Sequence, residues 1–358
     1  MNSPGFPSSK LLAWYRRHKR DLPWRRTRDP YRIWVSEAML QQTTVATVIP
    51  YYRRWLKRFP SMRRLAAASL PDVLKAWQGL GYYQRARNVH KAARLFCGRF
   101  EGRIPDDPHV LAEVPGFGPY TTAAVLSIAF DRPLTLIDAN VRRVMARYLV
   151  LKDAQGKGAD KAIQSCLDKA LPRGEAGDFN QALMELGALV CRKENPLCPA
   201  CPLKTRCGAW RQDLQDVIPG TPERQVEFIE AAAAVVERGD RVFLQQRGPK
   251  GLLAGLWEFP GGKIEKAETP EAALRRELRE ELGVSLPQAK LFMTVRHAYT
   301  RFRVRLHVYR CSADPLPGAD RTHRWVPVGR LKEYPVPSAT ARIIEALTEK
   351  GASRIEDR

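Results

Sequence analysis

The arrangement of apolar residues changes once along this chain, and this change constrains the fold more than any other feature of the sequence. Residues 8 to about 210 have the spacing of amphipathic helices, interrupted by prolines at 60, 71, 105 and 133. After a polar stretch at 211–227 that contains proline and glycine, apolar and polar residues alternate as in strands. We therefore predict a multi-domain protein: an all-α domain at 1–210, a linker at 211–227 and an α+β domain at 228–358.

Capping and turn residues predict where individual elements begin and end. A helix is predicted from Tyr31 through Val48, ending at Pro50, because proline disrupts a helix interior. Thr269 and Pro270 predict the start of another strong helix, which ends at Leu282, since threonine caps helices and proline is favoured at the first helical position. The predicted strands are Ala231–Val236 and Val242–Gln246, joined at Gly239-Asp240, and then Leu291–Arg296 and Arg303–Tyr309.

The charge of the chain limits the partners that it can bind. Lys and Arg number 60 against 38 Asp and Glu, giving a formal net charge of +22, which implies a polyanionic partner. An anionic membrane surface would also suit this charge, but the basic residues are spread along the chain rather than gathered on one helix. No apolar run reaches the roughly 18 to 20 residues that cross a bilayer, and residues 1–10 lack the apolar core of a signal peptide. We expect a soluble, intracellular, monomeric protein that binds nucleic acid.

Four of the seven cysteines lie close together near the end of the helical half. In a reducing compartment such clustering favours metal binding over disulfides. Four thiolates can bind either zinc or a [4Fe–4S] cluster. Zinc stays open as an alternative because C-x2-C pairs are common zinc ligands, although structural zinc motifs usually contain two such pairs and this set has one. The four are Cys191, Cys198, Cys201 and Cys207, with the spacing C-x6-C-x2-C-x5-C.

A turn and two carboxylates are the other candidate functional features of the helical half. Gly116 and Gly118 allow a tight turn at 114–120, and the next helix can bind a DNA phosphate with its free N–H groups. Glu37 lies within an apolar run, and Asp138 follows another. Two carboxylates in different environments can divide proton donation from stabilisation of a sugar cation. Each acid also has an ordinary explanation, a salt bridge for either one or a helix cap for Asp138.

Several segments resemble those of a known family. The segments LPWRR at 22–26, YRIWVSE at 31–37, MLQQT at 39–43 and GLGYY at 79–83 closely resemble segments of MutY-type adenine DNA glycosylases, in the same order. The turn at 114–120 matches the helix-hairpin-helix motif of the endonuclease III superfamily, and the cysteine spacing resembles its cluster loop. The resemblance implies a helix-hairpin-helix glycosylase domain with a [4Fe–4S] cluster at 191–207. It also implies hydrolysis, in base-excision repair, of the N-glycosidic bond of adenine mispaired with 8-oxoguanine or guanine in double-stranded DNA.

The resemblance also implies roles for individual residues. Glu37 would protonate the adenine ring and Asp138 would stabilise the sugar cation, both supported by Tyr120 and Asn140. Relatives that also cut the strand have a lysine where this chain has Tyr120, and a phenol cannot form a Schiff base. The resemblance thus implies a monofunctional enzyme of the cytoplasm, associated with the nucleoid. Alanine at 139 departs from the glycine that the family often has. The implied substrate-binding and DNA-binding residues are Trp24, Arg25 and Gln181 around adenine, Gln42 and Tyr82 as wedges in the duplex beside the lesion while the target base flips out, and Gln41, Thr43, Gly116 and Gly118 along the DNA.

The second half contains a complete Nudix box. Residues 262–284 fit G-x5-E-x7-R-E-U-x-E-E-x-G-U at every fixed position. Glu277, Glu280 and Glu281 fall at i, i+3 and i+4 of the predicted helix, where a divalent cation such as Mg²⁺ or Mn²⁺ would relieve their repulsion. The alternative is a surface neutralised by the interleaved arginines. The resemblance to MutT-type Nudix domains implies a lesion-reading domain, and the intact box leaves open an additional or principal hydrolysis of oxidised nucleoside triphosphates.

The resemblance also implies a lesion-reading hairpin at Tyr299, Thr300 and Arg301, where family members commonly have Phe-Ser-His. Tyrosine can still wedge and threonine can still donate a hydrogen bond. Arginine in place of histidine adds charge near a phosphate or the guanine edge. Adenine excision is therefore better supported by the sequence than the preference for the oxidised base.

Overall fold

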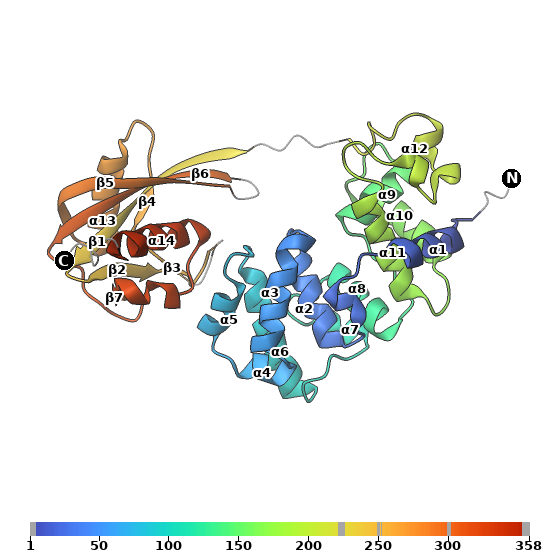
Figure 1. Ribbon diagram of the computed structural model, residues 1–358, viewed down its shortest axis with the longest axis horizontal. Helices are drawn as coiled ribbons and strands as arrows, with labels where there is room; N and C mark the ends of the chain where they lie inside the picture. The colour runs from blue at the N-terminus through green and yellow to red at the C-terminus, as the bar shows by residue number, and fades with distance from the viewer. Residues whose placement is uncertain (1–4, 221–225, 249–250, 252, 299–301, 353–358) are drawn as a thin grey trace. The chain divides into compact units, whose positions relative to one another are not determined.

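The computed structural model describes residues 5–220, 226–248, 251, 253–298 and 302–352. The chain forms two compact units, residues 1–67 with 88–222, and residues 68–87 with 223–358. The first unit is helical and the second is built on a sheet, as the sequence predicts. Figure 1 shows the helices of the first unit and the sheet of the second.

The first unit packs its helices around a shared apolar interior. One side of that interior is formed by α1, α8, α9, α10 and α11, with Leu11, Val141 and Phe179 buried at its centre. On the other side Trp34 stacks on Phe117 with ring centroids 5.4 Å apart. The α-helices are α1 (Ser8–His18), α2 (Pro30–Leu40), α3 (Val45–Arg58), α4 (Met62–Ala67), most of α6 (Gln84–Arg99), α7 (Pro108–Ala112), α8 (Pro119–Phe130), α9 (Ala139–Leu149), α10 (Lys157–Ala170), α11 (Ala176–Leu189) and α12 (Gly208–Arg211), and the 3-10 helices are η1 (Pro23–Arg26), η2 (Cys198–Ala200) and η3 (Lys204–Arg206).

The stretch predicted as one helix from Tyr31 through Val48 is two helices. Helix α2 ends at Leu40, and Gln42 has a left-handed φ of 58°. The hydroxyl oxygen of Thr44 then accepts a hydrogen bond from the Thr47 N–H and caps α3. The prediction missed this cap because threonine was counted as part of the helical pattern.

The predicted stop at Pro50 is also wrong, because α3 continues to Arg58. Proline removes one backbone hydrogen bond from a helix interior. Tyr52 and Trp55, which follow it in α3, are both buried. Burying two aromatic side chains stabilises the continued helix by several kcal/mol, about as much as a proline costs or more.

The second unit is a mixed sheet with helices on both faces. Its strand order is β3-β2-β1-β6-β5, with β4 also paired to β1 and β7 to β2. Strands β1 and β6 are parallel, with Ala231 opposite Leu306. The elements are α5 (Leu70–Trp77), β1 (Glu227–Arg238), β2 (Arg241–Gln246), β3 (Trp257–Glu258), β4 (Gly261–Lys263), α13 (Pro270–Leu282), β5 (Ser285–Ala298), β6 (Phe302–Asp314), β7 (His323–Pro327), η4 (Val328–Glu333) and α14 (Ser338–Ala352).

Strand β1 separates two apolar layers because successive side chains of a strand point to opposite faces. Ala234 and Val236 pack in one layer with Leu274 and Leu278 of α13. Val235 packs in the other layer with side chains of α14. The predicted helix at 270–282 is confirmed in full, since Thr269 accepts a hydrogen bond from the Ala272 N–H and caps α13.

Residues 68–87 belong to the second unit, although the sequence places them inside the predicted helical domain at 1–210. Three side chains of this segment donate hydrogen bonds to main-chain carbonyls of the second unit. Lys75 donates to the Tyr334 oxygen, Tyr83 to the Val336 oxygen and Arg87 to the Ala254 oxygen. Long-range hydrogen bonds of this kind leave no periodic pattern in the sequence, so composition and spacing could not predict them.

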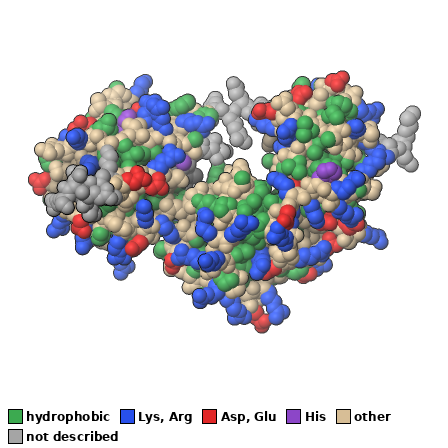
Figure 2. Space-filling model, viewed as in Figure 1, with side chains coloured by type: hydrophobic (Ala, Val, Ile, Leu, Met, Phe, Trp, Pro, Cys, Tyr) green, Lys and Arg blue, Asp and Glu red, His purple; other side chains and the backbone are tan. Residues whose placement is uncertain are grey.

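Lys and Arg side chains are spread over the visible face of both units (Figure 2), in keeping with the net charge of +22. In the part of the chain that the structure describes, no helix is long and apolar enough to cross a membrane.

Candidate active site

The first unit contains a cleft of about 1030 Å³. It is bounded by the C-terminal end of α2, the residues between α2 and α3, and the N-terminal ends of α8 and α9. Side chains of η1 and α11 complete its lining. Ten residues predicted from the sequence line this cleft together, namely Trp24, Arg25, Glu37, Gln41, Gln42, Thr43, Tyr120, Asp138, Asn140 and Gln181.

Glu37 is buried in the cleft, with 4 % of its surface exposed. The Tyr120 hydroxyl of α8 donates a hydrogen bond of 2.6 Å to Glu37 Oε2. Burial raises the pKa of Glu37 to about 7, while the bond from Tyr120 lowers it and the charge of Asp138 raises it further. A carboxyl with such a pKa can hold a proton near neutral pH and donate it, as a general acid must.

Asp138 combines a helix cap with a place in the cleft. Its Oδ1 accepts a bond of 2.6 Å from the Val141 N–H, which caps α9, and its Oδ2 accepts one of 3.1 Å from Asn140 Nδ2. Burial raises the pKa of Asp138, while the Val141 and Asn140 bonds lower it. The simple capping explanation is therefore correct, and the carboxylate lines the cleft at the same time.

A chain of hydrogen bonds leads from Asp138 to the cysteine loop. Asn140 Oδ1 accepts a bond of 2.9 Å from Arg143 Nη2, and Arg143 Nε donates one of 2.8 Å to the main-chain oxygen of Cys191. Arg143 also donates to the Gly187 oxygen. Arg143 thus links the first cysteine of the loop to Asp138 through Asn140.

The adenine-pocket residues predicted around Trp24 are organised by an acid that the sequence analysis missed. Glu185 of α11 is 1 % exposed and accepts hydrogen bonds from both Arg20 and Arg25. These bonds hold the pKa of Glu185 at about 2, against the opposing effect of burial. An acid within the apolar residues of 176–189 was the available signal, because acids are rarely buried unless paired. Gln181, one turn earlier, also lines the cleft.

The residues between α2 and α3 form the rim of the cleft. Gln41 Nε2 donates a bond of 3.1 Å to Thr121 Oγ1 of α8. Gln42 and Thr43 follow in the turn that ends α2. The break between the helices, which sequence reasoning missed, places these three side chains at the cleft.

The turn at 114–120 is packed against other residues at Gly116 and Phe117, and it has free space around Gly118, just before α8 begins. Phe117 is buried, and Gly116 has a φ of 88°, with the Asn88 side chain close enough to restrict any larger residue. Gly118 precedes α8, and a side-chain carbon placed there would meet no atom within 4 Å. The first N–H groups of α8 therefore have room for a phosphate.

The four clustered cysteines are free thiols on one loop. Arg147, which is 3 % exposed, contacts Cys191 Sγ at 3.3 Å and donates to the main-chain oxygens of Arg192 and Lys193. Burial raises the pKa of Cys201 to about 12, and the nearby charges of Cys191 and Cys207 raise it further. Among the described residues, no three or more His, Cys, Asp or Glu side chains are arranged to hold a single metal ion.

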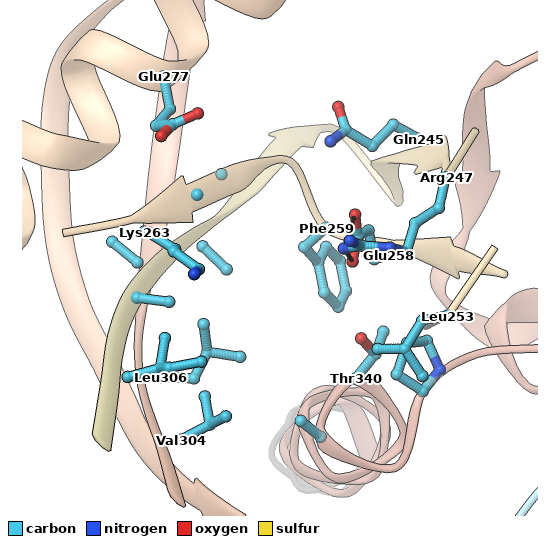
Figure 3. Close-up of a pocket in the computed structure, with 18 of the residues that line it drawn as sticks. Gln245, Arg247, Leu253, Glu258, Phe259, Lys263, Glu277, Val304, Leu306 and Thr340 are labelled. Carbon is cyan, nitrogen blue, oxygen red and sulfur yellow. Dashed lines mark hydrogen bonds and ion pairs between the residues drawn. The ribbon is translucent and has the colours of Figure 1, made fainter. Parts of the chain in front are cut away.

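The second unit contains a separate hollow of about 1060 Å³ beside the Nudix box. Figure 3 shows Glu277 and Lys263 on one side of it, with Leu306 and Val304 below them and Phe259 opposite. Glu281 also lines the hollow and accepts a bond of 3.1 Å from Gln245.

The third predicted metal ligand lies elsewhere. Glu280 is 60 % exposed and lies 3.3 Å from Arg276, which also pairs with Glu268 and Glu277. A side-chain carbon on Gly262 would meet the Glu277 carboxyl, which would have to move to make room. The structure thus brings two of the three acids to the hollow and neutralises part of the box with Arg276.

The remaining predicted residues divide between the described and undescribed parts. Tyr82 belongs to the second unit and has a φ of 48°. Tyr299, Thr300 and Arg301 lie outside the described residues.

Comparisons with known proteins agree with both halves. Residues 35–169 match the family described as HhH-GPD superfamily base excision DNA repair protein, and residues 231–346 match the NUDIX domain family. The adenine DNA glycosylase of Mus musculus is 34 % identical, over 97 % of this chain and 80 % of that protein. That of Buchnera aphidicola subsp. Baizongia pistaciae is 35 % identical, over 70 % and 72 %. The chain belongs to the adenine DNA glycosylase family.

Solved structures of other DNA glycosylases share the helical fold of the first unit. A thermostable thymine-DNA glycosylase superposes with a TM-score of 0.52 at 29 % identity, over 57 % of this chain and 95 % of that one. A non-covalent endonuclease III–DNA complex gives 0.50 at 23 % identity, over 58 % and 95 %, which supports the fold alone. As an adenine DNA glycosylase, the protein is an N-glycosyl hydrolase of base-excision repair that acts on DNA. Members of the family typically carry an iron–sulfur cluster.

Proposed function

We propose that this adenine DNA glycosylase removes adenine mispaired with 8-oxoguanine or guanine from double-stranded DNA, acting as a monomer on the nucleoid in the cytoplasm. The observation that carries the proposed chemistry is the buried Glu37 with its pKa near 7, hydrogen-bonded to Tyr120 in a cleft that also contains Asp138. A flipped adenine would enter between Trp24, Arg25 and Gln181. Gln41, Gln42 and Thr43 would contact the DNA strand at the rim, and the N-terminus of α8 after Gly116 and Gly118 would bind a phosphate.

The reaction needs a proton donor and an anion at different positions. Glu37 gives its proton to a ring nitrogen of adenine, and the glycosidic bond breaks with its electron pair leaving on the base. Asp138, held by Val141 and Asn140, stabilises the resulting sugar cation. Water then adds to the sugar carbon and gives up a proton to the Glu37 carboxylate, which regenerates the acid and leaves an abasic site and free adenine. Tyr120 orients the Glu37 carboxyl throughout.

The first test is single-turnover cleavage of duplexes with adenine opposite 8-oxoguanine, guanine, cytosine or thymine, with hot alkali to reveal abasic sites. We expect fast release opposite 8-oxoguanine and slower release opposite guanine. No release from any duplex would overturn the proposed substrate. Because Tyr120 replaces the lysine of strand-cutting relatives, omitting the alkali should leave the strand intact. Nicking at neutral pH without alkali would contradict a monofunctional enzyme.

We also propose that Cys191, Cys198, Cys201 and Cys207 bind a [4Fe–4S] cluster. The donor set fits, because four thiols share one loop and the charge of Arg147 lies 3.3 Å from Cys191 Sγ. The cluster, when bound, would fix the loop that carries Lys193, Lys204 and Arg206 toward phosphates. Purified protein should contain about four irons and four sulfides per chain. Zinc in place of iron, or full iron content after Cys201→Ser, would contradict this assignment.

A second activity is favoured by the hollow of the second unit. Glu277 and Glu281 line a space large enough for a nucleotide, next to a complete Nudix box. With Mg²⁺ or Mn²⁺ at these two carboxylates, the unit would hydrolyse an oxidised nucleoside triphosphate to monophosphate and pyrophosphate.

Pyrophosphate release from 8-oxo-dGTP by the full chain tests this second activity. We expect release to require Mg²⁺ and to be lost in Glu281→Gln but kept in Glu37→Gln. No turnover of any oxidised or normal triphosphate would leave lesion reading as the sole function of this unit.

A further inference from the structure

The turn that carries Tyr82 is built by its immediate neighbours. The Trp77 Nε1–H donates a bond of 3.1 Å to the Gly81 oxygen, and Arg85 donates one of 3.1 Å to the Leu80 oxygen. The guanidinium of Arg85 lies over the rings of both Trp77 and Tyr82, at 5.4 and 5.5 Å. A left-handed φ is unfavourable for tyrosine and persists where the surroundings hold it. Trp77 and Arg85 therefore fix the backbone that presents Tyr82.

The same turn is fixed to the second unit on both sides of Tyr82. Lys75 Nζ donates a bond of 3.1 Å to the Tyr334 oxygen, and Tyr83 Oη donates one of 3.1 Å to the Val336 oxygen in a buried position. Arg87 donates to the Ala254 oxygen. Because Tyr83 follows Tyr82 directly, its buried hydroxyl limits how far Tyr82 can move.

Two of the carbonyls that accept these bonds, those of Tyr334 and Val336, lie on either side of a residue that is bonded to the sheet. Between the oxygens of Tyr334 and Val336, the Pro335 oxygen accepts a bond of 2.9 Å from the Trp257 N–H of β3. Three consecutive carbonyls thus alternate between the Tyr82 segment and the sheet. The segment is bonded to the second unit through side chains, at two carbonyls that flank the carbonyl bonded by the main chain of β3.

The framework continues toward the strand that leads to residues 299–301. Helix α14 begins at Ser338, directly after the anchoring carbonyls, and Arg342 of α14 donates a bond of 3.0 Å to the Arg296 oxygen of β5. Strand β5 ends at Ala298, next to the hairpin predicted to read the lesion. Tyr82 and the end of β5 therefore belong to one connected set of elements.

We propose that the second unit positions Tyr82 against the base opposite adenine, and that Tyr83 is the main positioning residue, acting through its hydrogen bond to Val336. This proposal rests on the proposed function and on the family resemblance, which implies that Tyr82 wedges into the duplex beside the lesion. It makes discrimination between 8-oxoguanine and guanine a property of the second unit and of residues 68–87 together, while the chemistry stays in the cleft of the first unit.

The test compares Tyr83→Phe with Tyr31→Phe in the full chain. Both variants remove a buried tyrosine hydroxyl that donates to a main-chain carbonyl, but Tyr31 donates to the Phe59 oxygen in the first unit. The readout is the ratio of single-turnover adenine-release rates opposite 8-oxoguanine and opposite guanine. A general loss of folded protein lowers both rates together and leaves this ratio unchanged.

We expect Tyr83→Phe to lower the ratio about two- to tenfold, the range for loss of one hydrogen bond, and Tyr31→Phe to leave it unchanged. Hydrogen exchange should quicken at residues 78–87 and 334–337 in Tyr83→Phe alone. An unchanged ratio in Tyr83→Phe overturns the proposal, whatever the exchange shows. An unchanged ratio in Tyr82→Ala also overturns it, because Tyr82 would then not read the opposite base. Failure of the proposed function differs from both results, since wild type itself would release no adenine.

Discussion

Two buried glutamates line the same cleft and have opposite electrostatic environments. Glu37 accepts its hydrogen bond from a neutral phenol, and burial raises its pKa to about 7. Glu185 accepts bonds from two guanidinium groups, and its pKa falls to about 2. The charge of the partner thus decides whether a buried carboxyl can hold a proton or is a permanent anion. One wall of the cleft can donate a proton, while the other fixes Arg20 and Arg25 in place.

Removing the proton from the Glu37 wall should have the largest effect on activity. Glu37→Gln preserves the shape of the side chain and its contact with Tyr120 but cannot act as an acid. We expect single-turnover adenine release to fall about 10²- to 10⁴-fold, the usual contribution of general acid catalysis. Binding to an uncleavable duplex is the control and should stay within a few-fold of wild type. Release within tenfold of wild type would mean that another group supplies the proton.

Removing the second charge should have a slightly smaller effect. Asp138→Asn keeps an N-cap for α9, since asparagine caps as well as aspartate, but neutralises the group facing the sugar cation. We expect adenine release to fall about 10²- to 10³-fold, as for loss of one preorganised electrostatic contact. Circular dichroism and thermal unfolding should match wild type. A large loss of stability with a proportionate loss of rate would reduce Asp138 to its capping role.

The raised pKa of Glu37 should also make the free energy of unfolding depend on pH. The pKa of Glu37 rises from 4.5 unfolded to about 7 folded, so the folded state binds more protons between these values. The stabilisation is fully present below pH 4.5 and is lost as the pH rises through 7, a change of ~3 kcal/mol. Urea unfolding of wild type against Glu37→Gln from pH 4.5 to 8 should show this difference. Parallel curves for the two proteins would contradict the raised pKa.

Removing the negative charge of Glu185 should have the smallest of these effects. Glu185→Gln removes the anion that Arg20 and Arg25 share, leaving Arg25 10 % exposed and without its carboxylate. We expect a loss of about 2 kcal/mol at neutral pH, less than for a fully buried ion pair because Arg20 is 36 % exposed. Unfolding at pH 7 measures this loss. A neutral or stabilising substitution would show that the two arginines find other partners.

Some features of this cleft could be predicted from the sequence because their signals are local. Asp138 precedes a helix, and Glu37 lies in an apolar run, so both stood out without any tertiary information. Thr269 and Pro270 likewise fixed the start of α13. Helix caps and polar residues in apolar runs depend only on residues that are neighbours in the sequence. These predictions therefore agree with the structure.

Other features could not be predicted because they depend on contacts across long sequence separations. Glu185 pairs with Arg20, which lies 165 residues earlier in the sequence. No residue near either one in the sequence indicates that they pair. The turn at Gln42 was missed because a four-residue break between two helices resembles a continuous helix in periodicity. Tyr83 looked like one aromatic residue of a turn, and its bond to Val336 joins distant parts of the chain.

The membership of residues 68–87 in the second unit has a consequence for how the protein is made. A chain is synthesised from its N-terminus, and domains generally fold as their sequences emerge. Lys75, Tyr83 and Arg87 are translated long before Ala254, Tyr334 and Val336, whose carbonyls accept their hydrogen bonds. The segment that contains Tyr82 therefore cannot form these hydrogen bonds until residues 254–336 have been synthesised. The segment at 68–87 is synthesised early but becomes fully hydrogen-bonded only when the second unit has folded. A chain truncated after the first unit would therefore contain every residue of the cleft and still lack the hydrogen bonds that support Tyr82.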